Sequence, residues 1–353
     1  MPKYSFKNDY SEGAHEQILK ALLNTNLDQD EGYGEDRYCK EAINLIGKKI
    51  QDPNASIHFV SGGTQANLIV ISALLKPYQS VIAASTGHIA VHEAGAIEAT
   101  GHKINTVETK DGKLTPYEVK SVIDFHTDEH MVQPKMVFIS NSTEVGSIYN
   151  KKELTDLSQF CKKNNLYLYL DGARLGSALT SNKNDLTISD IAKLVDIFYI
   201  GGTKNGTLLG EAIVIINDNL KENFRYHLKQ KGALLAKGRI LGIQFLELFK
   251  NDLFFELATH ANNMSFKLAN EIKKLGYNFL TEPASNQIFP ILPDDLIAKL
   301  NKKYDFHIWC RVDNKNSAIR LVTSWATKEE FVDDFIIEIE ENASKQQKPK
   351  QFR

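Results

Sequence analysis

Short apolar segments alternate along most of this chain with segments of helical period. Residues 56–60 (SIHFV), 136–140 (MVFIS) and 166–170 (LYLYL) are almost continuously apolar. Such runs are typical of strands in a sheet that is covered on both faces. Strands that alternate with helices pair in parallel through crossover helices. The sequence therefore predicts an α/β fold with a mostly parallel sheet between helices.

The same patterns predict where the elements lie and where the chain divides. From about Phe224 to Leu275 the apolar residues recur with the period of long helices, and short predicted strands and helices follow. We therefore expect a large domain over residues 1–250, a small α+β domain over 251–343 and a flexible tail over 344–353. We expect helices at 14–25, 39–50, 88–100, 116–125, 152–164 and 188–195, and strands at 56–60, 80–84, 104–107, 136–140, 166–170, 197–200 and 211–216.

Charge and composition exclude several classes of protein. The 42 basic and 44 acidic side chains leave a net charge of −2, which argues against nucleic acid as the main partner. No run of about 20 apolar residues is present, so we expect no contact with a membrane, and the first residues do not have the pattern of a signal peptide. Three widely spaced cysteines predict neither disulfides nor a zinc site and suit the cytoplasm.

Four predicted strands are each followed by residues that can carry chemistry. In an open α/β sheet the ligand lies beyond the carboxyl ends of the strands. The sequence therefore predicts that one edge of the sheet receives glycines, an Asp, an Arg and a Lys. The four segments are Gly62-Gly63-Thr64-Gln65, Asn141-Ser142-Thr143-Glu144, Asp171-Gly172-Ala173-Arg174 and Gly201-Gly202-Thr203-Lys204.

Each segment alone allows more than one interpretation. The glycine-rich turn can bind a phosphate at a helix start or be a plain turn, and it has neither the dinucleotide nor the P-loop pattern. Lys204, between two apolar strands, can be a desolvated nucleophile or a surface lysine. Asp171 can hold a protonated ring nitrogen, bind a metal or cap the next turn. Arg174 can bind a carboxylate with its fork.

Taken together, five segments in order resemble a known family. They are SGGTQAN, GHIAVHEAGA, LDGAR, GGTKNG and IRLVTSWAT, and the early NDY and GYGED segments fit as well. The set resembles the low-specificity L-threonine aldolases and β-eliminating lyases, which are fold-type-I enzymes dependent on pyridoxal 5'-phosphate (PLP). The resemblance runs from about Phe6 to Phe335. It implies the aspartate aminotransferase fold, with a large domain and a smaller C-terminal domain.

The resemblance also implies roles for individual residues around the cofactor. Lys204 would form the Schiff base, Asp171 would pair with the ring nitrogen, and His88 would stack on the ring. Arg174 would contact both the cofactor and the substrate. The phosphate would be held by four further residues, namely Gly63, Thr64, Gln65 and Thr203.

Other residues would bind the substrate or act between subunits. Arg174 and Arg320 would bind the substrate carboxylate, and Asn8 would lie near it. Tyr33 would reach an active site, which can be that of the neighbouring subunit, and Lys237 would contact the phosphate across the interface. The resemblance thus implies a homodimer or homotetramer with shared active sites.

Two departures from the family pattern concern the reaction. Many family aldolases have Glu-Asn-Thr-His after the strand that precedes the Asp strand, where this chain has Ser140-Asn141-Ser142-Thr143-Glu144, so no histidine is present there. Handling of the β-hydroxyl proton would then fall to His88, Glu144 or water. The family's Arg-Ser-Asp start is Lys7-Asn8-Asp9 here, so Asn8 replaces a serine.

The implied reaction is retro-aldol cleavage of L-threonine or L-allo-threonine, with a small amino acid as substrate. A β-eliminating lyase, an aminotransferase or a non-catalytic protein of the same fold remain alternatives. His88, His92 and Glu93 have a helical spacing that also allows a metal, but the pattern is not HExxH and no third ligand is evident. We therefore expect no metal site.

Overall fold

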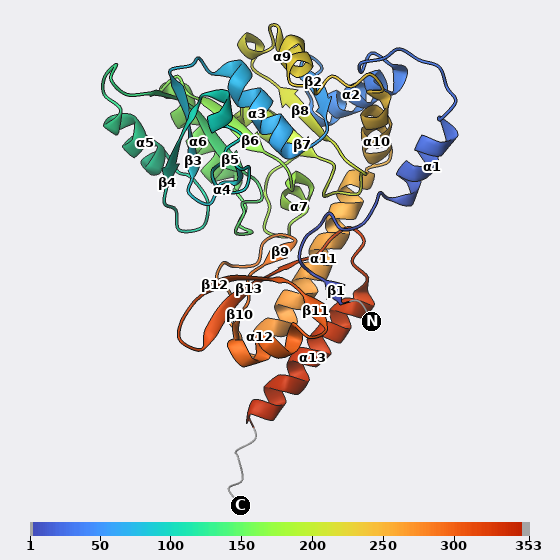
Figure 1. Ribbon diagram of the computed structural model, residues 1–353, viewed down its shortest axis with the longest axis vertical. Coiled ribbons are helices and arrows are strands. Elements are labelled where there is room, and N and C mark those ends of the chain that lie inside the picture. The colour runs from blue at the N-terminus through green and yellow to red at the C-terminus, as the bar shows by residue number, and fades with distance from the viewer. Residues whose placement is uncertain (1–2, 348–353) are drawn as a thin grey trace, which may run out of the picture.

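A seven-stranded sheet forms the centre of the larger part of the structure, a computed structural model that describes residues 3–347, with side chains to Asn342 (Figure 1). The strand order is β2-β8-β7-β6-β5-β3-β4. All neighbours are parallel except β8, which is antiparallel to both β2 and β7. This confirms the predicted α/β fold with its mixed, mostly parallel sheet. The strands are β2 (Ser56–Val60), β3 (Gln79–Ala84), β4 (Lys103–Val107), β5 (Gln133–Ser140), β6 (Tyr167–Asp171), β7 (Ile197–Gly201) and β8 (Glu211–Ile215).

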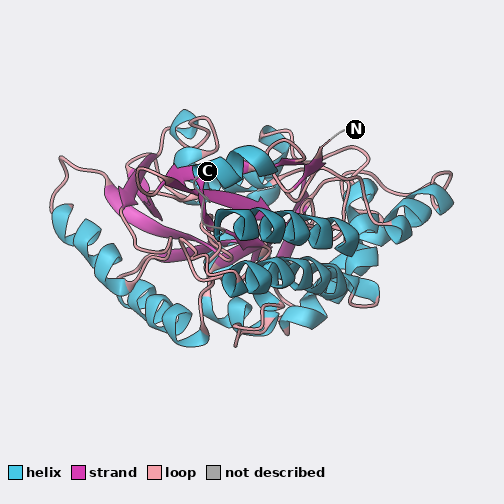
Figure 2. Cartoon of the chain, turned by 90° about the horizontal axis from the view of Figure 1, so that it is seen from below, coloured by secondary structure: helices cyan, strands magenta, loops and turns pink. Residues whose placement is uncertain are grey.

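Helices cover the two faces of this sheet and create two separate apolar cores (Figure 2). Alternate residues of each strand point to opposite faces. On β6, Leu168 and Leu170 therefore join one core, whereas Tyr169 joins the other. The first core contains residues of α1 (Glu16–Asn24), α2 (Arg37–Ile50), α5 (Pro116–Phe125), α6 (Lys151–Lys163), α8 (Ile188–Leu194) and α10 (Arg239–Lys250), and the second those of α3 (Gly63–Leu74) and α9 (Phe224–Gln230).

Helix starts in this part follow local sequence signals. Three of the helices begin at a capping box, in which the side chain of the cap residue and the acidic residue three positions later satisfy each other's backbone N–H. These boxes are Thr115 with Glu118, Asn150 with Glu153, and Thr187 with Asp190.

One predicted helix is wrong. Residues 88–100 form only the short α4 (His88–Val91) and a 3-10 turn (Glu98–Thr100). Ala94 and Gly95 both have positive φ angles, 51° and 73°, which a right-handed helix does not allow. The chain therefore turns here instead of continuing as a helix.

The smaller part of the structure is built on an antiparallel sheet with its own core. Its four strands are β9 (Gln287–Ile288), β10 (Ile291–Pro293), β12 (His307–Arg311) and β13 (Asn316–Val322). They pack with α11 (Leu253–Lys274), α12 (Asp294–Leu300) and α13 (Glu329–Gln347). The N-terminal β1 (Tyr4–Ser5) pairs in parallel with β11 (Tyr304–Asp305), and Phe6 is buried in this core. The remaining elements of the described chain are α7 (Leu175–Leu179) and the 3-10 turn Asp218–Leu220.

The chain passes between the two parts at residues 251–252, where α10 ends and α11 begins. We propose the division predicted from the sequence, a large domain to residue 250 and a small one to 343, with the first residues packed on the small one. Residues 344–347, which the sequence placed in a tail, continue α13. The rest of the predicted tail, 348–353, lies outside the described residues. Within residues 3–347 no helix combines the length and the apolar character that crossing a bilayer requires.

The crossing of α2 and α10 supplies a test of packing. A Cβ atom on Gly242 would lie 2.7 Å from the backbone N and 2.8 Å from the Cα of Cys39, so the helices would have to separate. We expect Gly242→Ala to lower the free energy of unfolding by about 2 kcal/mol, because overpacking outweighs the better helix propensity of Ala. Urea unfolding would measure it. Gly13→Ala, whose Cβ meets nothing within 4 Å, is the control; equal stability of the two variants would contradict this packing.

Candidate active site

The carboxyl ends of β5, β6 and β7 meet at one edge of the sheet. Ser140 and Asp171 are register partners on β5 and β6, and the Asn141 N–H donates to the Asp171 carbonyl at 3.0 Å. The Gly201 N–H donates to the Gly172 carbonyl at 2.9 Å. The segments after these strands therefore lie together, as the parallel pairing predicted.

Arg174 is held at this edge by a carboxylate from the start of the chain. Its Nε and Nη2 donate to the two oxygens of Asp9 at 2.7 and 2.9 Å. Asn286 Nδ2 also donates to Asp9, at 2.9 Å, and Asp9 is 1% exposed. These three residues line a small cavity together with Lys204 and Asn205. Burial alone would raise the pKa of Asp9, but the charges of Arg174 and Lys204 bring it below the ordinary value.

Lys204 lies beside this ion pair and is desolvated. Burial and the nearby Arg174 charge lower its pKa, against the opposing effect of Asp9, Asp171 and Glu211. A lower pKa leaves more of the amine neutral and therefore nucleophilic. The structure thus favours a partly buried, desolvated nucleophile over the surface-loop interpretation.

Glu211 is a buried carboxyl on the other side of the lysine loop. It is the register partner of Gly201, and one of its oxygens accepts the Gly202 N–H at 3.1 Å. Burial raises the pKa of Glu211 to about 8, although hydrogen bonds from Thr203 and Gly202 and the charge of Lys204 act in the opposite direction. The edge therefore combines cationic groups with a carboxyl that holds its proton tightly.

Asp171 is fixed by three donors. The Tyr199 hydroxyl donates to Oδ1 at 2.6 Å, the Ala173 N–H to the same oxygen at 3.0 Å, and Asn67 Nδ2 to Oδ2 at 3.4 Å. Asp171 and Tyr199 lie on the face of the sheet that α3 covers. The carboxylate therefore has one defined orientation.

His88 is connected to the same network. Its Nδ1 lies 2.8 Å from Oε1 of the buried Glu93, which also accepts from Asn67 Nδ2 at 2.7 Å. Glu93 thus orients the His88 ring. The rings of His88 and His92 are 5.6 Å apart, but in the part of the chain that the structure describes no three metal-ligating side chains converge.

The glycine-rich turn opens α3 at Gly63, close to Tyr199. A Cβ on Gly63 would lie 2.9 Å from the Tyr199 hydroxyl, so this close approach requires glycine. Thr64 is exposed in the first turn of α3. Gln65 Oε1 instead accepts from the N–H and the hydroxyl of Ser61, at 3.0 and 2.9 Å, which ties this side chain to the preceding strand.

Two residues that the sequence predicted for the site form hydrogen bonds with residues near them in the chain. The Thr203 hydroxyl accepts the Gly210 N–H at 3.0 Å and so closes the turn that carries Lys204. Asn8 Oδ1 accepts from the Tyr10 N–H and the Ser11 hydroxyl, at 3.0 and 2.9 Å. Its neighbour Asp9, rather than Asn8, reaches Arg174.

Arg320 reaches the site from β13, in the smaller part of the structure. Its Nη2 donates to the Lys7 carbonyl at 3.1 Å, and its guanidinium lies 5.6 Å from the centre of the Trp309 ring. Burial and the Arg174 charge lower its pKa, which places the two arginines near each other. Nε of Arg320 is buried and has no hydrogen-bond partner among the described residues.

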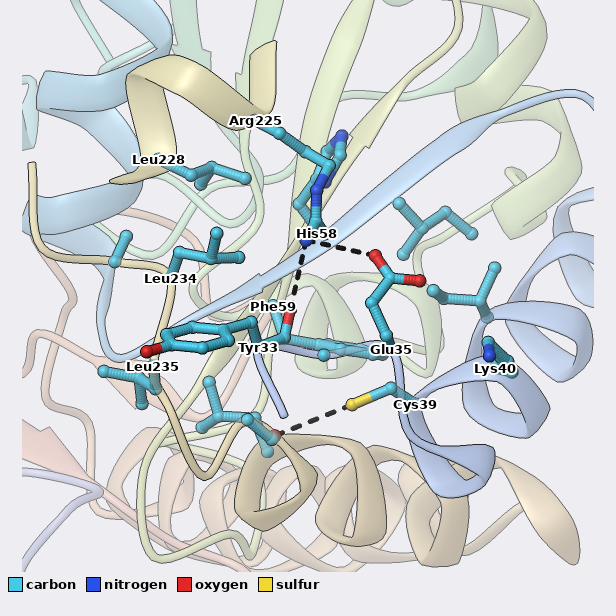
Figure 3. A pocket seen from close by; sticks show the side chains of 16 residues that line it. Tyr33, Glu35, Cys39, Lys40, His58, Phe59, Arg225, Leu228, Leu234 and Leu235 are labelled. Carbon is cyan, nitrogen blue, oxygen red and sulfur yellow. Dashed lines mark hydrogen bonds and ion pairs between the residues drawn. The ribbon is translucent and has the colours of Figure 1, made fainter. Parts of the chain in front are cut away.

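The structure does not bring Tyr33 and Lys237 to Lys204 within one chain. Tyr33 lines a separate cavity with Glu35 and Arg225, and Nη2 of Arg225 donates to the Tyr33 carbonyl (Figure 3). Lys237 lines a further pocket, with residues of the loop that precedes α2.

Several residues of the site were not assigned a role from the sequence. Asp9 and Glu93 stand inside two segments already noted, NDY and GHIAVHEAGA. The signal that could have identified them is an acidic residue within a family motif. Asn67 likewise stands inside a noted segment, SGGTQAN. Glu211 and Asn286 had no signal, because they join the site only through the fold.

Known proteins resemble the chain over nearly its full length. Residues 9–294 match the family described as beta-eliminating lyase. A low-specificity L-threonine aldolase of a Pseudomonas species is 31% identical over 95% of this chain and 96% of its own length. A solved structure of Leishmania major threonine aldolase is 49% identical, with a TM-score of 0.95 over 96% of this chain and 99% of that one. A Thermus thermophilus aspartate aminotransferase, 15% identical, shares the fold with a TM-score of 0.70 over 95% of this chain and 90% of its own.

The Asp9–Arg174 pair supplies a test of the site's stability. We expect Asp9→Asn to lower the free energy of unfolding by about 3 kcal/mol, because it leaves a buried guanidinium without its counter-charge. Urea unfolding would measure it. Because the pKa of Asp9 is lowered in the folded protein, the contribution is present above the ordinary Asp value and is lost on acidification. The difference from wild type should therefore persist near neutral pH and shrink below about pH 4.

The control for this variant is Asp305→Asn. Asp305 pairs with Lys7 at 3.5 Å, and both side chains are 41% exposed. An exposed pair of this kind contributes less than about 1 kcal/mol. Equal losses in the two variants would contradict the special role of the buried pair.

Proposed function

The chain belongs to the β-eliminating lyase family, and on this premise we propose that it is a PLP-dependent carbon–carbon lyase that cleaves L-threonine and L-allo-threonine to glycine and acetaldehyde. The observation that carries the proposal is the sheet edge where the desolvated Lys204 lies with Asp171 and Arg174. Similarity to named threonine aldolases over nearly the whole chain supports the same reaction.

The donors and acceptors at this edge fit the cofactor. Asn141 Nδ2 is buried and has no hydrogen-bond partner among the described residues, at the edge that also carries Asp171. The first turn of α3 presents free backbone N–H groups, which suit a phosphate. Lys204 would hold the cofactor covalently, Asp171 would pair with its ring nitrogen, and His88 would cover the ring.

The phosphate would lie against the start of α3, near Gly63 and Thr64. Gln65 and Thr203 would act there mainly through the backbone and the turns that they stabilise, because their side chains have partners of their own. Bound PLP supplies a protonated ring that accepts the electron pair of the broken bond. The chain's own side chains must then orient the substrate and handle its protons.

The substrate carboxylate would bind between Arg174 and Arg320. The fork of Arg174 is already occupied by Asp9, so Arg320, with its unpartnered Nε, would make the principal contact. Two guanidinium groups side by side favour an anion. Asn8 would contribute by shaping the turn that delivers Asp9.

The other reactions on this scaffold are less well supported. β-Elimination and transamination use the same cofactor and the same lysine, but three relatives that are at least 30% identical over more than nine-tenths of this chain are named threonine aldolases. A non-catalytic protein would have no need for a desolvated lysine beside two arginines and a fixed Asp.

We further propose a homodimer or homotetramer with shared active sites. Large apolar side chains are exposed on α1, on the loop after it and on α10, with Leu27 91% exposed. Tyr33 and Lys237 line pockets of the same region, away from Lys204 of their own chain. A second copy would cover this surface and bring both residues to its own active site. The exposed apolar residues are Leu19, Leu23, Leu27, Tyr33 and Ile240.

The cytoplasm is the proposed compartment. All three cysteines are free in the structure, with Cys39 and Cys161 buried and Cys310 exposed. Free thiols of this kind suit a reducing environment. The near-balanced charge argues against nucleic acid as the partner, and the named threonine aldolases support a small amino-acid substrate.

Product analysis tests the reaction. The PLP-loaded protein should release acetaldehyde and glycine in equal amounts from L-threonine and from L-allo-threonine. Lys204→Ala should abolish this release by at least about 1000-fold, because the covalent link to the cofactor is lost. Borohydride should fix PLP to the wild type and not to this variant. The exposed Lys76→Ala is the control and should still be labelled; labelling of Lys204→Ala would contradict the assignment.

Mixing two variants tests the shared sites. Lys204→Ala and Tyr33→Ala should each be strongly impaired alone. If Tyr33 serves the partner's site, mixed dimers contain one intact site, and random pairing should restore about a quarter of the wild-type activity. Acetaldehyde release before and after subunit exchange would measure this. A Tyr33→Ala protein with full activity, or no gain on mixing, would show that the sites are not shared through Tyr33.

A further inference from the structure

The loop after β5 places a carboxyl group, Glu144, against the predicted ring-covering residue. Glu144 Oε1 accepts a hydrogen bond from the Ser140 hydroxyl at 2.8 Å and another from the backbone N–H of His88 at 3.0 Å. His88 in turn is held through its ring by Glu93. Glu144 therefore lies at the same sheet edge as Asp171, on the side of His88.

Charged and titratable groups face Glu144 from several elements. They are Asp171 at the end of β6, Arg174 just after it, His88 on α4 and Tyr149 after the β5 loop. Burial and the Asp171 charge raise the pKa of Glu144, while the hydrogen bond from Ser140 and the charge of His88 partly oppose this. A carboxyl with a raised pKa holds its proton to a higher pH than an ordinary Glu, and when ionised it is a stronger base.

Glu144 differs from the other carboxyls of the site in exposure. Asp9, Glu93, Asp171 and Glu211 are all buried, and each is engaged by partners already described. Glu144 is only partly buried. Among the described carboxyls of this edge it is thus the one that a substrate can reach.

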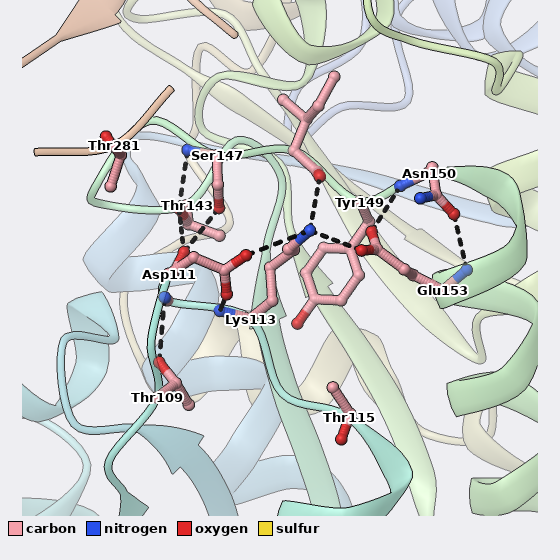
Figure 4. A network of polar contacts seen from close by, with 12 residues as sticks. Thr109, Asp111, Lys113, Thr115, Thr143, Ser147, Tyr149, Asn150, Glu153 and Thr281 are labelled. Carbon is pink, nitrogen blue, oxygen red and sulfur yellow. Dashed lines mark hydrogen bonds and ion pairs between the residues drawn. The ribbon is translucent and has the colours of Figure 1, made fainter. Parts of the chain in front are cut away.

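A rigid network fixes the loop that carries Glu144 (Figure 4). Thr143 and Ser147 share a hydrogen bond of 2.8 Å between their hydroxyls, and the Ser147 hydroxyl donates to the Asp111 carbonyl at 2.7 Å. From the small domain, the Thr281 hydroxyl donates to the Val145 carbonyl at 2.7 Å. Both sides of Glu144 are therefore anchored, as an acid–base group requires for accurate positioning.

The same network has a charged centre. Lys113 Nζ lies 2.7 Å from Glu153 and 3.3 Å from Asp111. These ion pairs join the loop before α5 to the start of α6 (Figure 4). The same loop contacts residues 143–147, because the Thr143 hydroxyl donates to the Asp111 carbonyl.

We propose that Glu144 is the acid–base group that takes the proton from the β-hydroxyl of the substrate. This inference rests on the proposed function. It answers which side chain replaces the histidine absent from this segment. His88 is less suited, because its Nδ1 is engaged by Glu93 and its ring would cover the cofactor.

The step balances in atoms and electrons. The ionised Glu144 carboxylate accepts the O–H proton, the O–H electron pair forms the C=O bond of the aldehyde, and the Cα–Cβ bond breaks. The electron pair of that bond goes to Cα, which then takes up one proton to give glycine. Glu144 supplies that proton or loses it to water, so no oxidant or reductant is required.

Glu144→Gln tests the proposal, because the amide retains an oxygen that can accept from Ser140 and His88 but cannot take a proton. Acetaldehyde release should fall at least about 100-fold, the usual contribution of a general base. PLP bound per chain and the melting temperature should stay at the wild-type values. Wild-type rates in this variant would overturn the proposal.

The pH profile separates an acid–base role from a structural one. Wild-type kcat/KM should rise with pH as Glu144 ionises, and the rise should be absent in Glu144→Gln. In Ser140→Ala the rise should shift to higher pH, because the lost hydrogen bond favoured the charged form. Glu144→His should recover activity with its rise near the ordinary histidine value of about 6.5. An unshifted profile in Ser140→Ala would overturn the proposal even if Glu144→Gln failed to fold.

Infrared titration of the cofactor-free protein gives a readout independent of turnover. The Glu144 part of the protonated-carboxyl band should disappear at a pH above the ordinary Glu pKa of about 4.3. That part should be missing in Glu144→Gln, whereas the part from Glu211, whose pKa is about 8, should remain. Identical titrations of the two proteins would contradict the assignment of that proton to Glu144. A wild type that releases no acetaldehyde would refute the proposed function, whereas an active wild type with an equally active Glu144→Gln would refute only this inference.

Discussion

The ion pair between Asp9 and Arg174 is the interaction on which the arrangement of the site depends. It joins the N-terminal segment to the loop after β6, and Asn286 adds the small domain to the same carboxylate. The pair also lies beside Lys204, so its two charges act on the amine with opposite sign. The desolvated lysine is tolerated here because the fixed charges of Asp9 and Arg174 replace the water that the amine lost.

Several buried carboxyls surround the cationic groups of the site. Asp171 and Glu93 are satisfied by neighbouring donors, and Glu211 by Gly202 and Thr203, so each has its own compensation. Among the described carboxyls of the site, only Glu144 combines a raised pKa with partial exposure. One site thus contains carboxyls that fix geometry and a carboxyl that is free to exchange its proton.

The sequence predicted the sheet well and the site only in part. Continuous apolar runs such as 166–170 identify covered strands, and the residues that follow them, Asp171 and Lys204, must share an edge for geometric reasons. The helix expected at 88–100 failed because local positive φ angles at Ala94 and Gly95 are not visible in hydrophobic periodicity. Asn286 and Glu211 were missed because their partners are distant in sequence and carry no local pattern.

The pairing of β1 with β11 has a consequence for synthesis of the chain. The Phe6 N–H donates to the Asp305 carbonyl and the Phe6 carbonyl accepts the Val322 N–H, so the backbone just before Asp9 is held by residues near the other end. Asp9 is synthesised more than 300 residues before Val322, so this backbone anchorage forms only after the strand around Val322 has emerged. The nascent large domain can therefore bury its strands while Arg174 still lacks its counter-ion. Assembly of the site therefore requires the C-terminal part of the chain.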